Sequence, residues 1–478
     1  MPYPSVLRTV AAVQSSPDQV LTAAQMRDAE GVLIDSGISV DDLMERAGRG
    51  AADWVWRMSG GRTVTVLCGP GNNGGDGYVI ARAIQERGGT VKVIAATEPK
   101  TAAARNARAL FAGEVLGPAA DCSGEVLVDC LFGTGLTRAL DPAQLALLSR
   151  LAADHHRRVA IDLPSGIHAD NGLMLNPGLP DWHLTLALGA WKPAHFLLPA
   201  AAAMGVQRLV DIGIRPLAEA ATAITRPRLR APSLEAHKYT RGLLGVIAGA
   251  MPGAALLAAK AAQGAGAGYV KLLGDAVVSP PDLVVDSSPL AEVLTDSRYR
   301  AVLVGPGLGR DAKARERLAI ALSEPIAAVL DADALVLLGA RQLAEREAAL
   351  IATPHDGELL ALERTFGLDG AGSKVGRAEA LARASGMVIV AKGADTLVAA
   401  PDGRVAFAPR GSSWLSSAGT GDVLAGAIAS RLASGADAFD AACQGVWLHG
   451  EAARRTPAPF SAGQLAERVR PAFNACLD

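Results

Sequence analysis

The chain contains 478 residues, of which 50% are hydrophobic, 20% are charged and 4% are aromatic, and its net charge at pH 7 is −2. This length predicts about two or three domains of ~150 residues, with ample apolar material for their cores. A net charge near zero and few aromatic residues argue against nucleic-acid binding, and against recruitment to an anionic membrane.

The five cysteines form no CxxC pair and no spacing typical of a metal site, so buried thiols in a reducing compartment are expected. No basic segment followed by an apolar core opens the chain, which argues against a signal peptide. The longest apolar stretches are broken by Gly, Pro or Lys, so no membrane span is predicted. We therefore expect a cytoplasmic protein without membrane or nucleic-acid partners.

Two helices are predicted ahead of the first strand. Thr22 precedes one of them as an N-cap, and Gln25 follows three positions later as its capping-box partner. Residues 41–58 carry apolar side chains at near-helical spacing and predict the other helix.

Short β-branched and apolar runs then alternate with helical patterns. The helical patterns cover residues 101–111 and 142–152, and the predicted strands cover 63–68, 91–95, 126–129, 159–162, 184–188 and 206–211. This alternation predicts a Rossmann-like domain with three α/β/α layers over residues 1–216, built on a doubly wound parallel sheet. Its ligand crevice is expected at the carboxyl ends of the strands.

A glycine-dense loop, Gly69 to Gly77, lies between the first predicted strand and a helix expected to begin near Tyr78. Glycines let main-chain N–H groups approach a phosphate closely, and the helix dipole adds partial positive charge there. Asn72, Asn73 and Asp76 add amide and carboxylate groups, so a cation or a hydroxyl-bearing ligand is predicted rather than a plain phosphate. A structural turn capped by Asn and Asp is the alternative.

Two further strand endings carry polar residues. Asp129 ends one strand before the turn Gly133-Thr134-Gly135, and Asp162 ends the next, shortly before Ser165. Each acidic residue alone could be a helix cap or a turn residue. Together with Asn73, the oxygen atoms of Asp129 and Ser165 suit a hard cation better than zinc, and one carboxylate among three ligands favours a monovalent ion.

The strings GPGNNGGDGYVIAR, VDCLFGTGL, IDLPSGIHADNG and LTLALGAWKP, in this order, resemble the NAD(P)H-hydrate epimerase family, the YjeF N-terminal domain, over about residues 21–216. The resemblance implies a potassium ion held by Asn73, Asp129 and Ser165, and Asp162 as a catalytic carboxylate beside the reacting ring. It implies interconversion of R- and S-hydrates, which needs a proton shuttle. The implied hydrate contacts, besides Asp162, are Asn72, Asn73, Gly74, Gly75, Asp76, Gly133, Thr134, Gly135, Leu136, Thr137, Arg138 and Ala139.

Residues 217–234 are Ala-rich and then punctuated by Pro and Arg, which predicts a linker. A second α/β domain is predicted over residues 235–478. Its strand-like runs end in the loops GPGLG, TPHDGE and KGADT, and Pro252 opens an Ala-rich helix.

The chemistry of this second domain concentrates at residues 417–426. Gly419, Thr420 and Gly421 open a predicted helix and form an anion site at its N-terminus. Asp422, inside that positive end, is placed to take a proton from a hydroxyl attacking phosphorus. The alternative for Asp422 is a favourable first-turn acid. A lone histidine at a strand end, such as His355, is more often a hydrogen-bonded structural residue than a base. Substrate contact by His355 is expected only because Gly307 and Asp422 can converge on the same crevice.

The strings HKYTRG, GAMPGAALLAA, GPGLG, LDADAL, TPHDGE, KGADT and AGTGDVLAG resemble the ribokinase-like superfamily and, within it, the NAD(P)H-hydrate dehydratase family, the YjeF C-terminal domain. The resemblance implies hydrate contacts at Ala254, Gly307, His355 and Asp422, with Asp422 catalytic. The implied nucleotide contacts are Lys392, Gly393, Ala394, Asp395, Thr396 and Gly421. Residues 401–403 predict a hairpin turn, and residues 412–417 depart from the smaller, Met-containing approach expected of this family.

Together the two resemblances imply a bifunctional repair enzyme that acts on NADHX and NADPHX, the hydrates of NADH and NADPH. The first domain would epimerise them, and the second would dehydrate the S-hydrate while ADP becomes AMP and phosphate, with Mg²⁺ accompanying the nucleotide. A homo-oligomer is expected, although the sequence does not define its size. Two alternatives stay open: a small-molecule kinase fused to a nucleotide-binding partner, and a non-catalytic scaffold over residues 1–216.

Overall fold

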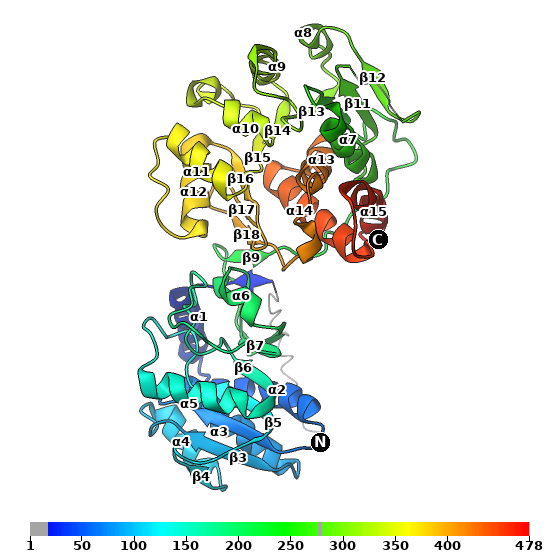
Figure 1. Ribbon diagram of the computed structural model, residues 1–478. Coiled ribbons are helices and arrows are strands. Elements are labelled where there is room, and N and C mark those ends of the chain that lie inside the picture. The colour runs from blue at the N-terminus through cyan, green and yellow to red at the C-terminus, as the bar shows by residue number, and fades with distance from the viewer. Residues whose placement is uncertain (1–17, 276–279, 478) are drawn as a thin grey trace, which may run out of the picture. The chain divides into compact units, whose positions relative to one another are not determined.

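The computed structural model describes residues 18–275 and 280–477. The chain divides into two compact units, unit 1 from Met1 to Ala220 and unit 2 from Ala221 to Asp478 (Figure 1). The sheet of unit 1 is parallel and that of unit 2 is mostly parallel, and each unit is described by itself.

The sheet of unit 1 has seven strands in the order β4-β3-β2-β5-β6-β7-β8, and all neighbouring pairs are parallel. The strands are β2 (Val64–Cys68), β3 (Val91–Ala95), β4 (Val115–Leu116), β5 (Gly124–Cys130), β6 (His155–Ile161), β7 (Leu184–Leu188) and β8 (Val206–Val210). The chain runs from β2 outward through β3 to β4, and then returns to place β5 on the other side of β2. The strand order therefore reverses between β2 and β5, where a doubly wound sheet opens its crevice.

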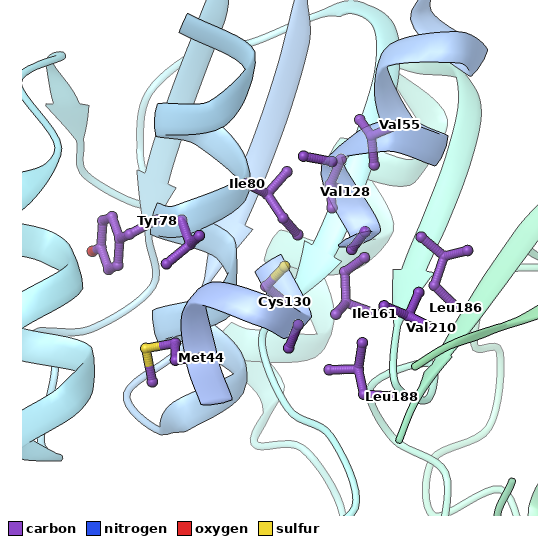
Figure 2. Packing of buried hydrophobic residues seen from close by; sticks show 14 of the residues in the cluster. Met44, Val55, Tyr78, Ile80, Val128, Cys130, Ile161, Leu186, Leu188 and Val210 are labelled. Atoms are coloured by element: carbon purple, nitrogen blue, oxygen red, sulfur yellow. The ribbon is translucent and has the colours of Figure 1, made fainter. Parts of the chain in front are cut away.

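Helices cover both faces of this sheet, so its strands are apolar on both sides. Val66 and Cys68 pack into one core with α1, α2, α3 and α4, whereas Leu67 packs into the opposite core with α5. Figure 2 shows the first core, in which Val55, Ile80 and other helical side chains meet the sheet residues. The helices are α1 (Ala23–Asp35), α2 (Val40–Ser59), α3 (Asn72–Glu86), α4 (Ala102–Leu110), α5 (Pro142–Ala153) and α6 (Ala200–Ala203).

The predicted capping box at the start of α1 is confirmed, because Thr22 and Gln25 cap each other's main chain. The loop predicted over Gly69 to Gly77 is shorter in the structure, because α3 begins at Asn72 and not near Tyr78. Its glycines serve close packing: a Cβ at Gly74 would lie 1.9 Å from the Gly69 carbonyl oxygen, and one at Gly77 would lie 2.7 Å from the sulfur of Cys68. The first six residues of α3 are polar or glycine, and they are helical because the rest of the helix packs on the sheet.

The sheet of unit 2 has the strand order β9-β18-β17-β16-β15-β14-β13-β10-β11-β12. Its strands run parallel except for β17, which is antiparallel to β16 and β18. The strands are β9 (Ala221–Ala223), β10 (Leu243–Ile247), β11 (Tyr269–Leu273), β12 (Val284–Asp286), β13 (Tyr299–Val304), β14 (Ala327–Leu330), β15 (Leu350–Ala352), β16 (Val388–Ala391), β17 (Leu397–Ala399) and β18 (Val405–Phe407). Strand β10 has β11 on one side and β13 on the other, which makes a second switch point.

Helices α7, α13 and α14 pack on one face of this sheet. Helices α7 and α13 approach so closely that a Cβ at Gly426 would lie 2.1 Å from the carbonyl oxygen of Ala258. The longer helices of unit 2 are α7 (Pro252–Gly264), α9 (Ala312–Ser323), α11 (Asp356–Thr365), α12 (Lys374–Ser385), α13 (Thr420–Ala433), α14 (Ala438–Arg455) and α15 (Ala462–Asn474). The shorter ones are α8 (Leu290–Val293) and α10 (Asp333–Leu337).

The predicted linker, residues 217–234, contains structure that the sequence did not indicate. Ala221–Ala223 form β9, which pairs in parallel with β18, and Leu229 makes a β-bridge to Leu477. Of the three residues of β9 only Thr222 favours a strand, and its partner β18 lies more than 180 residues away in the chain, so no local signal indicates this pairing.

The predicted hairpin turn at residues 401–403 is confirmed: it joins β17 to β18, with Gly403 at a φ of 94°. None of the helices in the described residues is long and apolar enough to cross a membrane. All five cysteines are free thiols, and four of them are buried.

Candidate active sites

The polar strand endings of unit 1 meet at its switch point. Asn73 lies in the first turn of α3, directly beyond β2, and Asp129 lies near the end of the neighbouring β5. Asp162 follows β6, and Ser165 comes three residues later. A Cβ placed on Gly133 would lie 3.0 Å from Asp162 Oδ2 and 3.5 Å from Asn73 Oδ1, so three separate loops converge on one point.

Asp162 is the most constrained residue of this site. Its φ is 65°, a left-handed conformation that is rare for residues other than glycine and clusters at functional positions. Its Oδ2 accepts hydrogen bonds from the main-chain N–H of Thr134 at 3.0 Å and from the Thr134 hydroxyl at 2.8 Å. Its Oδ1 accepts from the ammonium group of Lys192 and, at 3.3 Å, from the N–H of Leu188.

Lys192 is a buried cation, only 1% exposed, and sequence reasoning did not single it out. Besides Asp162, its ammonium group donates to the Leu188 carbonyl at 2.8 Å. Burial opposes ionisation of the Asp162 carboxyl, but the Lys192 charge and its hydrogen bond outweigh this and lower the pKa of Asp162. The two residues therefore form a buried ion pair at the centre of the site.

His195 holds the main chain of this pair in place. Its Nδ1 accepts from the N–H of Lys192 at 2.9 Å, so the proton of the neutral ring is on Nε2. Nε2 then donates to the carbonyl oxygen of Asp162, 3.0 Å away. Burial, together with the charge of Lys192, lowers the pKa of His195 to about 4, which keeps the ring neutral at pH 7.

Two further carboxyl groups surround the pair. Burial, followed by the negative charge of Asp162, raises the pKa of Asp76 well above its usual range. Burial also raises the pKa of Glu30, and the Lys192 charge opposes this. The site thus combines an ionised carboxylate with a carboxyl that tends to keep its proton, an arrangement suited to acid–base chemistry.

The three residues expected to hold potassium also lie together. Asp129 accepts from the N–H of Ser165 and from its hydroxyl, both at 2.8 Å. Burial raises the pKa of Asp129 to about 6, and the hydrogen bonds oppose this. The buried amide oxygen and nitrogen of Asn73 have no hydrogen-bond partner within residues 18–275 and 280–477, which fits a site for an added oxygen-ligated ion. No group of three His, Cys, Asp or Glu side chains that could hold a metal occurs in those same ranges.

The turn after β5 is only partly directed at this site. Gly133 approaches Asp162, Thr134 donates hydrogen bonds to it, and the Asp76 carboxyl in the first turns of α3 feels its charge. Asn72, in the same turns, is exposed, whereas a Cβ on Gly74 would meet Gly69 and one on Gly75 would meet Met44. Leu136 instead packs into the core beneath α5. Gly135, Thr137, Arg138 and Ala139 are exposed, and no hydrogen bond among the described residues joins them to Asp162.

In unit 2 the predicted glycine turn lies at the N-terminus of α13. Gly419 is the N-cap residue with a φ of 87°, and Gly421 and Asp422 occupy the first helical turn. Burial, followed by the charge of Asp331, raises the pKa of Asp422 to about 6, while Lys392 opposes this. A carboxylate with this pKa is mostly ionised at neutral pH and can still take up a proton.

Lys392, at the end of β16, links this turn to the neighbouring strands. Its ammonium group lies 2.6 Å from Asp331 Oδ1 and 3.8 Å from Glu358 Oε2. A Cβ on Gly421 would be 3.6 Å from the same ammonium group. Asp331 is buried and also accepts from the Thr353 hydroxyl at 2.6 Å. Lys392 is therefore oriented by a buried carboxylate towards the N-terminus of α13.

The other predicted nucleotide contacts follow Lys392. Gly393 and Thr396 hydrogen-bond to each other, and Asp395 pairs with Lys374 at 2.5 Å. Ala394 is exposed in the same turn. Residues 392–396 thus form an ordered loop beside the N-terminus of α13, as a nucleotide site requires.

The predicted hydrate contacts of unit 2 occupy three strand ends. A Cβ on Gly307 would lie 3.1 Å from the Cβ of Ala254, so the loop after β13 and the first turn of α7 lie against each other. His355 is the N-cap of α11, and its Nδ1 accepts from the N–H groups of Gly357 and Glu358. The structural role left open for His355 is therefore present, and its side chain, 62% exposed, still faces solvent.

Sequence reasoning missed Lys192, His195 and Asp331 as members of these sites. The available signal for Lys192 was a single lysine in the apolar stretch 184–198, four residues after the buried strand β7. Asp331 lies in the motif LDADAL, at the end of another buried strand, β14.

These two units define an α/β enzyme with two separate sites: a Rossmann-like unit with an acid–base centre, and a ribokinase-like unit with an anion-binding helix end, a carboxylate and a lysine. Family models describe these regions, "YjeF-related protein N-terminus" matching residues 40–194 and "NAD(P)H-hydrate dehydratase" matching residues 244–473. The chain belongs to the family of bifunctional NAD(P)H-hydrate repair enzymes.

Two relatives carry this assignment, and one solved structure is similar to part of the chain. The chain is 33% identical over 485 residues to the bifunctional NAD(P)H-hydrate repair enzyme Nnr of Mycobacterium leprae, covering 95% of this chain and 99% of the relative. It is 34% identical to the Mycobacterium tuberculosis protein of that name, covering 87% and 89%. The ADP/ATP-dependent NAD(P)H-hydrate dehydratase of Bacillus subtilis, co-crystallised with ATP and Mg²⁺, is 28% identical over 52% of this chain and 95% of its own, with a TM-score of 0.45.

Proposed function

We propose that unit 1 interconverts the R- and S-hydrates of NADH and NADPH, and that unit 2 dehydrates the S-hydrate with ADP. The observation that carries this proposal is that each unit pairs a buried acid at a strand end with a lysine: Asp162 with Lys192, and Asp331 with Lys392 beside Asp422. Burying an ion pair costs desolvation free energy that a non-catalytic scaffold could avoid with apolar residues, which favours a catalytic role.

In unit 1, Asp162 acts as the catalytic carboxylate at the hydrated carbon. Lys192 keeps it ionised, and Thr134 fixes its second oxygen. Asp76, which tends to remain protonated, is the second proton-carrying group facing the same point. The rest of the substrate lies along α3 residues Asn72 to Gly75 and the turn 133–139.

We assign the potassium site to Asn73, Asp129 and Ser165. Their oxygen atoms suit a hard monovalent cation, and the unpartnered Asn73 amide is accounted for by such a ligand. When bound, the ion supplies positive charge that stabilises negatively charged groups of the substrate.

A test of the cation site is replacement of Asn73 by alanine. Epimerisation is expected to fall about 10-fold or more in KCl, because one neutral ligand is lost and the remaining ones stay in place. Wild-type activity should be several-fold higher in potassium chloride than in tetramethylammonium chloride at equal ionic strength, and the variant should lose this difference. Equal activity of the wild type in both salts would exclude a potassium requirement.

In unit 2, Asp422 takes the proton of the hydrate hydroxyl as its oxygen attacks the β-phosphorus of ADP, and AMP leaves. The C–O bond then breaks, phosphate departs with the electron pair, and loss of a ring proton restores the double bond of NAD(P)H. The α13 N-terminus and Lys392 offer positive charge for the transferred group. Mg²⁺ adds charge neutralisation to the nucleotide, held chiefly by its phosphates and water.

The experiment that tests this function follows absorbance at 340 nm. Purified protein and ADP should restore the absorbance of a mixture of R- and S-hydrates completely, whereas unit 2 activity alone would stop after the S-hydrate. ATP in place of ADP should be slower. No recovery with either nucleotide, by a folded protein, would refute the proposal. We further propose that the protein is cytoplasmic, because its free thiols suit a reducing compartment. A homo-oligomer is also proposed, on the family resemblance alone.

A further inference from the structure

A groove runs along the carboxyl edge of the unit 2 sheet, beside β10, β11 and β12. Its larger part has a volume of about 370 Å³ and is bounded by Gly274, the segment Ser287–Ala291 and the first turns of α9. This volume lies within the range of pockets that hold small ligands. A smaller hollow of about 130 Å³ continues it and shares Asp275, Lys313 and Arg317 with it.

The smaller hollow leads towards the proposed hydrate site. It is lined by Gly249, Ala250 and Leu308. Leu308 follows Gly307, whose carbonyl accepts from the N–H of Met251, and a Cβ on Gly307 would approach Ala254. The groove therefore begins at the switch point between β10 and β13, where this sheet type binds ligands. The proposed nucleotide loop, residues 392–396, follows β16, four places away from β10 in the strand order.

The groove presents two cations from one helix. Arg317 donates to the carbonyl oxygen of Ala248 at 2.6 Å, which fixes the guanidinium at the groove wall and leaves its other N–H groups available. Lys313, one helical turn earlier, is exposed and lines both parts of the groove.

Three carboxylates also line the groove, and they differ in whether they are available to accept hydrogen bonds from a ligand. Asp311 is the N-cap of α9 and accepts from the N–H of Ala314 at 2.8 Å, so it serves the helix. Asp275 and Glu316 remain to accept hydrogen bonds from hydroxyl groups. A ligand with both phosphate and ribose hydroxyl groups matches this combination of cations and acceptors.

We propose that this groove binds the adenylate half of the hydrated dinucleotide, with Arg317 and Lys313 on its phosphate and the carboxylates on its ribose. The proposal rests on the function proposed for unit 2. In this arrangement the hydrated ring lies at Gly307 and Ala254, and ADP lies at the carboxyl end of β16. The adenylate half of the substrate extends the other way along the sheet edge, towards β11 and β12.

The test compares two substrates that differ only in this half: the S-hydrate of NADH and the S-hydrate of reduced nicotinamide mononucleotide, which has no adenylate. In the full chain, Arg317→Ala and Lys313→Ala are each expected to raise KM for the first hydrate about 10-fold, with kcat within twofold, because a charged contact to phosphate is lost. KM for the mononucleotide hydrate should not change. Arg315→Ala, an exposed residue of α9 outside the groove, is the matched control and should behave as wild type.

The possible outcomes distinguish an error in the groove proposal from an error in the proposed dehydratase function. If the wild type turns over the hydrates but both groove variants keep the wild-type KM, the groove proposal is wrong and the dehydratase function stands. An equal loss on both substrates would also overturn it, since the effect would then not depend on the adenylate. If the wild type dehydrates neither hydrate, the function itself fails, and the inference fails with it.

Discussion

Replacement of Asp422 by asparagine is expected to lower kcat for ADP-dependent dehydration by about 10³-fold, within the range attributed to a general base. Asparagine keeps the size of the side chain but cannot accept the hydroxyl proton. KM should change little, because the α13 N-terminus and Lys392 still receive the phosphates. Steady-state recovery of 340 nm absorbance from the S-hydrate measures this directly, and epimerisation of the same sample should stay at the wild-type rate.

The pH profile supplies a second check on the same residue. Burial and Asp331 raise the pKa of Asp422 to about 6, and the base works only when it is ionised. The kcat/KM of the wild type should therefore fall as the pH drops through about 6, and the variant should lack this limb. Asp440→Asn is the matched control, because Asp440 is also the third residue of its helix, α14, but lies on the surface. A kcat of Asp422→Asn within threefold of the wild type would remove Asp422 from the mechanism.

Most of the fold could be predicted from the sequence because the strands are buried on both faces. Runs such as residues 63–68 and 184–188 contain only apolar residues and threonine, with no charged residue at any position, as expected for strands of a sheet covered by helices on both sides. Their alternation with helical patterns then left little choice of topology, since crossover connections between parallel strands are right-handed. The strand-end positions of Asn73, Asp129 and Asp162 followed from that topology.

The remaining features depend on contacts between residues distant in the chain. Helix α3 begins at Asn72 because its glycines pack against Gly69 and Cys68, and helix propensity alone argues against this start. Lys192 lies 30 residues after Asp162, and nothing local to either residue indicates that they pair. Asp331 and Lys392 are 61 residues apart and come together only because β14 and β16 flank β15.

The Lys192 pairing predicts the second large effect. Lys192→Met keeps the length of the side chain but leaves the Asp162 carboxylate buried without its counter-ion, so the free energy of unfolding of unit 1 should fall by about 3–5 kcal/mol at pH 7. In the wild type the lowered pKa of Asp162 stabilises the fold above the unfolded pKa, and this contribution is lost as the pH falls through the folded value. Without Lys192 the pKa of Asp162 rises, so the difference in the free energy of unfolding between variant and wild type should shrink as the pH falls from 7 towards 4. Urea unfolding of both proteins at pH 7 and at pH 4 measures this difference.

Epimerisation by Lys192→Met should fall at least 100-fold at pH 7, since the carboxylate would be protonated or displaced when it is needed. Lys92→Met, at an exposed position of β3, is the matched control and should alter neither stability nor activity. The double variant Lys192→Met with Asp162→Asn removes both charges and should recover most of the stability but none of the activity, because a buried pair can be replaced by neutral groups while its chemistry cannot. If the stabilised double variant epimerised at the wild-type rate, or if Lys192→Met were as active as the Lys92→Met control, the ion pair would be a structural feature and not the acid–base centre of unit 1.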